Sequence, residues 1–212
     1  MSSPPRLPHS FGAFARADAG ASAIEFALVL PIMLAILVGC LEFGRALDNQ
    51  RKVESLARTI ADLTSQGDTT DVIRSATMAD IVASGKLVLG PFNGTAVKIV
   101  VSALAVDLAG TVTKPRVCSS YATANASARS LGLAGDVTIP TGFNTPGMRY
   151  VFAEISMPYT PLFGSEVVRF FTGANNVFSL SSSMPWPVRV GKSYNENPYN
   201  EVIMPGGRAC YL

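Results

Sequence analysis

Glu25 is the residue of this chain whose position most needs a chemical explanation. It stands at the start of an uncharged apolar run, Phe26–Leu41. A carboxylate inside a membrane-spanning segment costs about 2.5–3.5 kcal/mol on insertion scales, so it needs a cationic partner or a place in the headgroup layer. The small residues Ala19-Gly20-Ala21 directly precede this site and follow a leader that contains arginines. This combination suggests a second chemical event, cleavage of the chain before the apolar run.

The cysteines offer one further covalent reaction. Cys40 lies inside the apolar run, where it is interpreted as a small hydrophobic residue. Cys118 and Cys210 are the two that lie outside it, so in an oxidising compartment they are the candidate intramolecular disulfide. The alternative is two buried free thiols.

The sequence lacks the residues that several common classes of enzyme site require. The chain has one histidine, His9, which lies in the leader, so the remainder has no histidine for a metal site, a catalytic triad or a general base. Phe163–Val167 contains Gly-Ser but lacks the glycines that a nucleophile elbow has two residues either side of its serine. We therefore predict no enzyme activity, no catalytic residues, no metal and no cofactor.

The elements that must position Glu25 are a membrane segment and a helix that continues beyond it. Residues 21–44 carry only Glu25 and Glu42 as charges and exceed the about 20 residues that a helix needs to cross the bilayer. Residues 1–20 are interpreted as a leader without a core. Residues 45–67 repeat apolar positions at steps of three and four, which predicts an amphipathic stalk, and the whole helix is expected over residues 21–66. These apolar positions run from Phe43 to Leu63 and mark one helical face.

Residues 68–212 are long enough to form a head of their own. A second helix is expected from Thr70 or Asp71 to Leu89. Strands are predicted over residues 96–107, 111–117, 149–159 and 177–189, with 137–139 as a short edge strand and 108–110 as a hairpin connection. The fold class is α+β: a long N-terminal helix packed on a mainly antiparallel sheet.

The N-terminal pattern resembles a known family. Gly20, followed after four residues by Glu25-Phe26 at the threshold of an apolar helix, resembles the processing motif of type IV pilins and pseudopilins. The segment GASAIEFALVLPIMLAILVGCLEFGRAL is similar to the N-terminus of the TadE/TadG-like family, pseudopilins or minor pilins of the tight-adherence, Flp-type pilus system of bacteria. The resemblance is dense over residues 19–66. Two later segments, Met157–Phe163 and Met184–Arg189, resemble strand ends of the family more loosely.

The resemblance implies roles for four residues. A prepilin peptidase would cut between Gly20 and Ala21, and Glu25 with Phe26 would serve recognition and assembly. Glu25 would pair with the new amine of Ala21, in its own or a neighbouring subunit. The alternative from the residues alone is that Glu25 sits in the headgroup layer.

The resemblance also implies a topology and partners. Residues 1–20 would be cytoplasmic and the head extracytoplasmic, with one crossing of the bacterial inner membrane; a count of positive charges alone would favour the reverse. The implied partners are the membrane, the prepilin peptidase, other pilins or pseudopilins and the assembly platform. The net charge of +2 gives no reason to expect nucleic acid. The competing hypothesis is an uncleaved, single-pass anchored protein whose head binds or adheres to a ligand.

Overall fold

The computed structural model describes residues 18–107, 114–162, 178–193 and 198–210, with the backbone alone for residues 18–21. The chain divides into two compact units, Met1–Gly44 and Arg45–Leu212. The expected hairpin connection at residues 108–110 lies outside the described residues.

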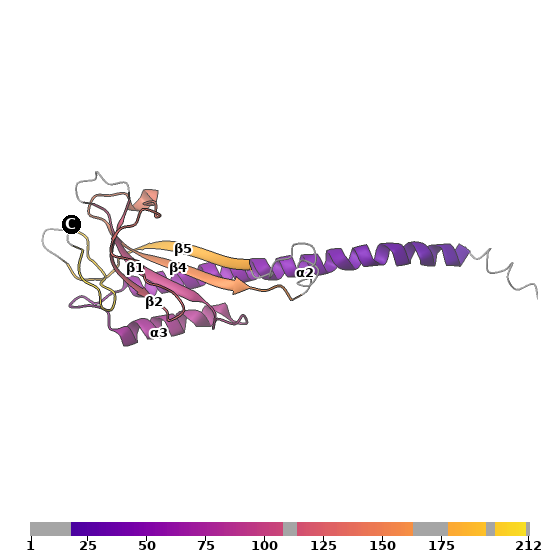
Figure 1. The fold of residues 1–212 in the computed structure, drawn as a ribbon, viewed down its shortest axis with the longest axis horizontal. Helices are drawn as coiled ribbons and strands as arrows, with labels where there is room; N and C mark the ends of the chain where they lie inside the picture. The colour runs from indigo at the N-terminus through magenta and orange to yellow at the C-terminus, as the bar shows by residue number, and fades with distance from the viewer. Residues whose placement is uncertain (1–17, 108–113, 163–177, 194–197, 211–212) are drawn as a thin grey trace, which may run out of the picture. The chain divides into compact units, whose positions relative to one another are not determined.

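One long helix, α2, covers Asp18–Ser65 and includes Pro31 (Figure 1). The prediction of one helix through residue 66 is confirmed to within a residue at its C-terminal end. The helix ends at Ser65, and Gly67 follows it with a φ of +38°, which is unfavourable for other residues. A Cβ added at Gly67 would lie 2.6 Å from the carbonyl oxygen of Val190. Glycine at this position therefore serves both the backbone turn and a close chain contact.

The sheet has five strands in the order β3-β2-β1-β4-β5, and each neighbouring pair is antiparallel (Figure 1). This arrangement confirms the α+β prediction. The strands are β1 (Lys98–Ala105), β2 (Arg116–Ala122), β3 (Gly132–Leu133), β4 (Arg149–Tyr159) and β5 (Phe178–Pro187).

The main core lies between one face of the sheet and two helices. These are the C-terminal part of α2 and α3 (Ser75–Lys86), which the short 3₁₀ helix Leu87–Leu89 follows. The helices approach closely at Gly85, because a Cβ there would lie 2.5 Å from Cδ1 of Ile60. The side chains that fill this core include Val53, Leu56 and Ile60 of α2, Met78 and Val82 of α3, and Ile99, Val101, Val151 and Ile155 of the sheet.

The opposite face of the sheet has a smaller core at one end. Val137 and Ile139 are buried there beside Tyr150 and Phe152, but they form no strand. The expected edge strand at residues 137–139 was therefore wrong, and the described edge strand on that side is β3. The apolar side chains of this segment cover the face of the sheet, and its backbone does not form one of the strands.

The remaining expectations differ at their boundaries. The second helix begins at Ser75, later than expected, because Asp68 caps a turn by accepting from the N–H and hydroxyl of Thr70. Along α2, the apolar side chains from Val53 to Ala61 are buried, whereas Phe43 and Leu47 are exposed.

Candidate processing and assembly site

The first turns of α2 contain the predicted processing residues. The backbone of Gly20 and Ala21 is helical, and Glu25 follows Ala21 by four residues, which places the two positions on one helix face. Glu25 is exposed, and Phe26 is 61% exposed. An amine on Ala21 would thus lie about one helical turn from the Glu25 carboxylate.

The helix surface beyond Glu25 is apolar and uncovered. Large side chains from Ile24 to Phe43 are exposed, and Leu28 is 70% exposed. By length and composition, α2 is the one helix in the described part of the chain that could cross a membrane, and its most apolar 18-residue window has no buried residue. A lipid environment would remove this surface from water.

A polar cluster fastens β5 to the other end of α2. The indole N–H of Trp186 donates to Oδ1 of Asp62 at 3.1 Å, and Nη2 of Arg189 lies 2.9 Å from the same oxygen. The Arg189 guanidinium also stands 5.8 Å from the Trp186 ring centroid. The segment Met184–Arg189, noted in the sequence, therefore connects the last described strand of the sheet to the long helix.

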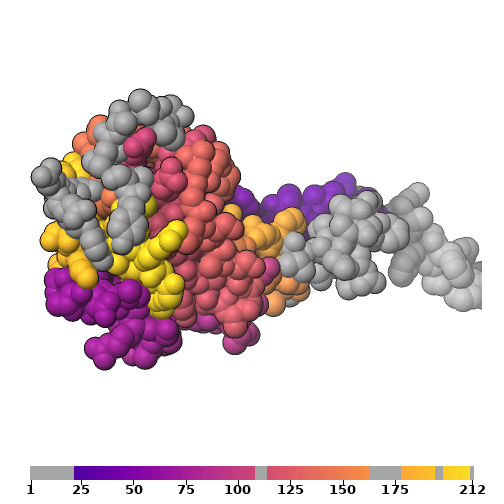
Figure 2. All heavy atoms as spheres, turned by 60° about the vertical axis from the view of Figure 1, so that its left-hand side comes forward, coloured from indigo at the N-terminus to yellow at the C-terminus, as the bar shows by residue number. Residues whose placement is uncertain are grey.

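A disulfide joins β2 to the C-terminal segment. Cys118 and Cys210 are bonded, with an S–S distance of 2.09 Å and a sequence separation of 92. The C-terminal segment is also held by main-chain bonds, since the Ile73 N–H donates to the carbonyl of Ile203 at 2.9 Å. Figure 2 shows part of this segment, in yellow, next to the purple part of the head.

A buried ion pair lies beside the disulfide. Nε of Arg149 is 3.6 Å from Oε2 of Glu201, and the side chains are 5% and 3% exposed. The Cys210 N–H donates to Oε1 of Glu201 at 2.7 Å. Burial lowers the pKa of Arg149 and raises the pKa of Glu201, so desolvation outweighs the attraction between them.

The residues around the disulfide include potential metal ligands. The potential ligand atoms of Cys118, Glu201 and Cys210 lie within 4.8 Å of one another. In the disulfide the two sulfurs bond each other, so neither is the thiolate that a metal ion requires. The residues in this state do not fit a metal site.

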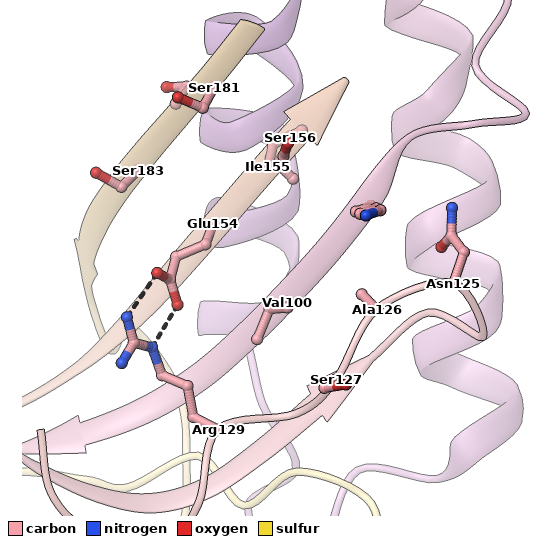
Figure 3. A pocket seen from close by; sticks show the side chains of 12 residues that line it. Val100, Asn125, Ala126, Ser127, Arg129, Glu154, Ile155, Ser156, Ser181 and Ser183 are labelled. Carbon is pink, nitrogen blue, oxygen red and sulfur yellow. Dashed lines mark hydrogen bonds and ion pairs between the residues drawn. The ribbon is translucent and has the colours of Figure 1, made fainter. Parts of the chain in front are cut away.

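A polar groove of about 660 Å³ lies on the open face of the sheet. Figure 3 shows Val100 on its floor, Ser181 and Ser183 of β5 on one side, and Asn125 on the other. Two of the charged residues that line it are paired with each other: Arg129 donates to Oε1 of Glu154 at 2.7 Å, and it also donates to both oxygens of Asp136 at 3.0 and 2.8 Å.

This ionic network is structural in character rather than reactive. The Arg129 hydrogen bonds hold the pKa of Asp136 below its usual range, and those to Glu154 and Asp136 raise the pKa of Arg129. The Asp136 carboxylate is therefore stabilised as an anion next to a fixed cation, the opposite of a poised general base.

Sequence reasoning missed these networks because their members are far apart in the chain. Arg149 and Glu201, or Asp62 and Trp186, share no local spacing that would signal a contact. By contrast, Gly20 and Glu25 belong to one short pattern at the start of a helix.

The comparisons with known proteins concern this same helix. Residues 20–62 match the family model described as TadE-like protein. Comparison with curated proteins and comparison with solved structures each found no match. Over residues 20–62, therefore, the chain is similar to the TadE-like family.

Proposed function

We propose that this chain is a pseudopilin or minor pilin that takes part in biogenesis of a tight-adherence, Flp-type pilus. The observation that carries the proposal is the TadE-like match over residues 20–62, which includes Gly20, Glu25 and the exposed apolar surface of α2. The α+β head has no described arrangement that favours catalysis, because the carboxylates with shifted pKa are paired with arginine or cap a turn. The proposed role is therefore one of assembly with other subunits.

The first step in this function is hydrolysis by a prepilin peptidase between Gly20 and Ala21. Water adds to the Gly20 carbonyl, and the chain leaves with a new amine on Ala21. A protease cleft binds extended chain, so the helical turn around this bond must unwind first. Glycine allows that change at low steric cost. The mature helix would then begin at Ala21.

The second step is insertion and packing of the mature helix. The amine of Ala21 is cationic near neutral pH and lies about one turn from Glu25, in the same subunit or a neighbour. Neutralising Glu25 in this way removes the cost of a lone carboxylate at the edge of the bilayer. We propose that residues 1–20 are cytoplasmic and that the head is extracytoplasmic. The Cys118–Cys210 bond supports this topology, since disulfides persist in oxidising compartments.

The test is the intact mass of the membrane-fraction protein, from cells with and without the peptidase. We expect a loss equal to residues 1–20 when the peptidase is present. Gly20→Asp should block the loss, whereas Gly12→Asp, a matched change within the leader, should not. A full-length mass in cells that contain active peptidase would favour the uncleaved, anchored binding protein instead.

A second variant separates processing from assembly. Glu25→Gln should be cut normally, because the scissile bond is unchanged, but should fail to enter the assembled complex. Glu25→Asp keeps the charge and is the matched control. Assembly is measured by co-purification of the pilus components in detergent. Normal assembly of Glu25→Gln would remove the proposed role of the carboxylate.

A further inference from the structure

The disulfide and the buried carboxylate beside it together hold three potential zinc ligands. Sγ of Cys118, Sγ of Cys210 and a carboxylate oxygen of Glu201 all lie within 4.8 Å of one another. Thiolate sulfur and carboxylate oxygen both bind Zn²⁺, and three protein ligands with one open position make a recurrent type of zinc site. The disulfide keeps both sulfurs from a metal ion while it is intact. Reduction of that bond would complete the ligand set.

The distances in the cluster suit zinc after a small movement of side chains. Tetrahedral zinc, with Zn–S bonds of about 2.3 Å and Zn–O bonds of about 2.1 Å, sets two sulfurs about 3.8 Å apart and a sulfur and an oxygen about 3.6 Å apart. Two free thiols separate to about their van der Waals distance, which is close to the first of these values. Because 4.8 Å is the largest separation in the cluster, the Glu201 carboxylate has to approach by about 1 Å.

The backbone around the three ligands is held by hydrogen bonds other than the disulfide. The Met204 N–H donates to Oγ of Ser119, the residue after Cys118, at 3.0 Å. The main chain of Glu201 exchanges two hydrogen bonds with Lys192, each of 2.9 Å. These bonds keep the C-terminal segment against β2 when the disulfide opens, so the ligands stay near one another.

The Glu201 carboxylate is also oriented by its neighbours. Its Oε1 accepts from the Cys210 N–H at 2.7 Å, and its Oε2 lies 3.6 Å from Nε of Arg149. Such outer contacts fix the direction of a carboxylate that binds a metal ion. Zn²⁺ with two thiolates is neutral, as the disulfide is, so its binding leaves the charge balance of the buried Arg149–Glu201 pair unchanged.

A small cavity leads to the two sulfurs. Its volume is about 200 Å³, and Cys118, Cys210, Arg116 and Arg208 are among the residues that line it. A cavity of this size holds several water molecules, so it offers a path for the ion and a water as fourth ligand. The two arginines would place the thiolates that zinc requires among cations.

We propose that the reduced head binds one Zn²⁺ through Cys118, Cys210 and Glu201, with water in the fourth position. A dithiol breaks the S–S bond by giving two electrons and two protons to the cysteines, and it becomes a disulfide itself. Zn²⁺ then displaces both protons from the thiols. The metal ion replaces the disulfide as the link between β2 and the C-terminal segment.

Cobalt binding by the full chain in detergent micelles tests the site. A trialkylphosphine opens the disulfide, taking an oxygen from water to become a phosphine oxide, and is removed under nitrogen. Co²⁺ should then give the sulfur-to-cobalt absorption of a thiolate site at one ion per chain, and Zn²⁺ should remove it. The oxidised chain should show no such band. Absence of the band from the reduced chain would overturn the proposal.

Substitutions test the three ligands separately. Glu201→Gln should weaken binding by about tenfold or more, the loss seen when a group that supports a zinc site is removed. Cys118→Ser should abolish the band, and it decides the question if Glu201→Gln does not fold. Asp136→Asn and Cys40→Ser, which lie outside the cluster, are the matched controls and should bind normally. Unchanged binding by Glu201→Gln or by Cys118→Ser would overturn the proposal.

Thermal unfolding shows whether the metal ion links the folded head. Zn²⁺ should raise the melting temperature of the reduced chain, but not that of the oxidised chain or of Cys118→Ser with Cys210→Ser. If the reduced chain unfolds without metal, Zn²⁺ should restore its circular dichroism spectrum. A reduced chain that neither melts higher nor refolds with Zn²⁺ would contradict the proposal. These measurements are independent of processing at Gly20, so they can fail while the proposed function stands.

Discussion

At the scale of single residues, the buried pair of Arg149 and Glu201 is the most costly interaction of the head to disturb. Both side chains are almost fully buried, and their attraction does not repay the loss of water. Each member of the pair keeps the other charge from being buried without a partner. The pair lies beside the C-terminal segment, since the Cys210 N–H donates to Glu201.

Arg149→Met should lower the free energy of unfolding by about 3–5 kcal/mol at neutral pH, because it leaves a buried carboxylate without its cation. The loss should shrink at low pH. Removing Arg149 raises the folded-state pKa of Glu201 further above its unfolded value, so the variant is most stable below the unfolded pKa and loses stability as pH rises through the folded pKa. Urea unfolding in micelles at about pH 4.5 and pH 7.5 measures this difference.

The matched control for that prediction is Asp136→Asn, which disturbs an ion pair whose carboxylate is 67% exposed. Its cost should stay below about 1 kcal/mol. An Arg149→Met loss that is the same at both pH values would contradict the assignment of the effect to Glu201.

At the scale of elements, the bounds of a strand could be predicted best where its side chains alternate regularly between the two faces of the sheet. β4 has its expected bounds, with Val151 and Ala153 on the helix side and Tyr150 and Phe152 on the other. β2 was misplaced because its second half, Ser-Ser-Tyr-Ala, lacks the apolar content that marks a strand, and its pairing with β1 decides its position. The processing residues were found because they are neighbours in sequence, whereas the ion pairs depend on the tertiary fold.

The attachment of β5 to α2 carries its own prediction. Trp186→Phe keeps the apolar contact but loses the donor to Asp62, which should cost about 1 kcal/mol. Amide exchange at Arg189 and Val190, whose N–H groups both donate to the Ser65 carbonyl, should become faster. Met184→Leu, a volume-conserving change on the same strand, should leave both measurements unchanged. Unaltered exchange in Trp186→Phe would show that the indole bond does not hold this junction.

The end of α2 supplies a backbone test. Gly67→Ala should destabilise the head by about 1–3 kcal/mol, because φ there is +38° and the new Cβ would meet the Val190 carbonyl. Gly135→Ala is the matched control, since a Cβ at Gly135 has no atom within 4 Å. Thermal unfolding followed by circular dichroism compares the two. Similar melting temperatures would mean that the turn after α2 relaxes without cost.

At the scale of the whole molecule, the last described strand of the head returns to the C-terminal part of α2, and the C-terminal segment returns to β2 and to the residues before α3. The return depends on a few long-range contacts: Asp62 with Trp186, the Ile73–Ile203 main-chain bond, and the Cys118–Cys210 disulfide. The disulfide is the one of these that depends on the compartment, so the proposed topology and the stability of the head are linked.

Reduction of the disulfide should therefore destabilise the head far more than any exposed contact. A crosslink that spans 92 residues removes loop entropy from the unfolded chain, which chain-entropy models put at about 4–5 kcal/mol. Cys118→Ser with Cys210→Ser should lower the melting temperature by the same amount as a dithiol reductant, whereas Cys40→Ser should not change it, because Cys40 is exposed on α2 and lies outside the bond. The reductant should have no further effect on the double variant. If the double variant melts like the unsubstituted, oxidised chain, the bond contributes nothing to the head, and the argument from the disulfide to an oxidising compartment loses its force.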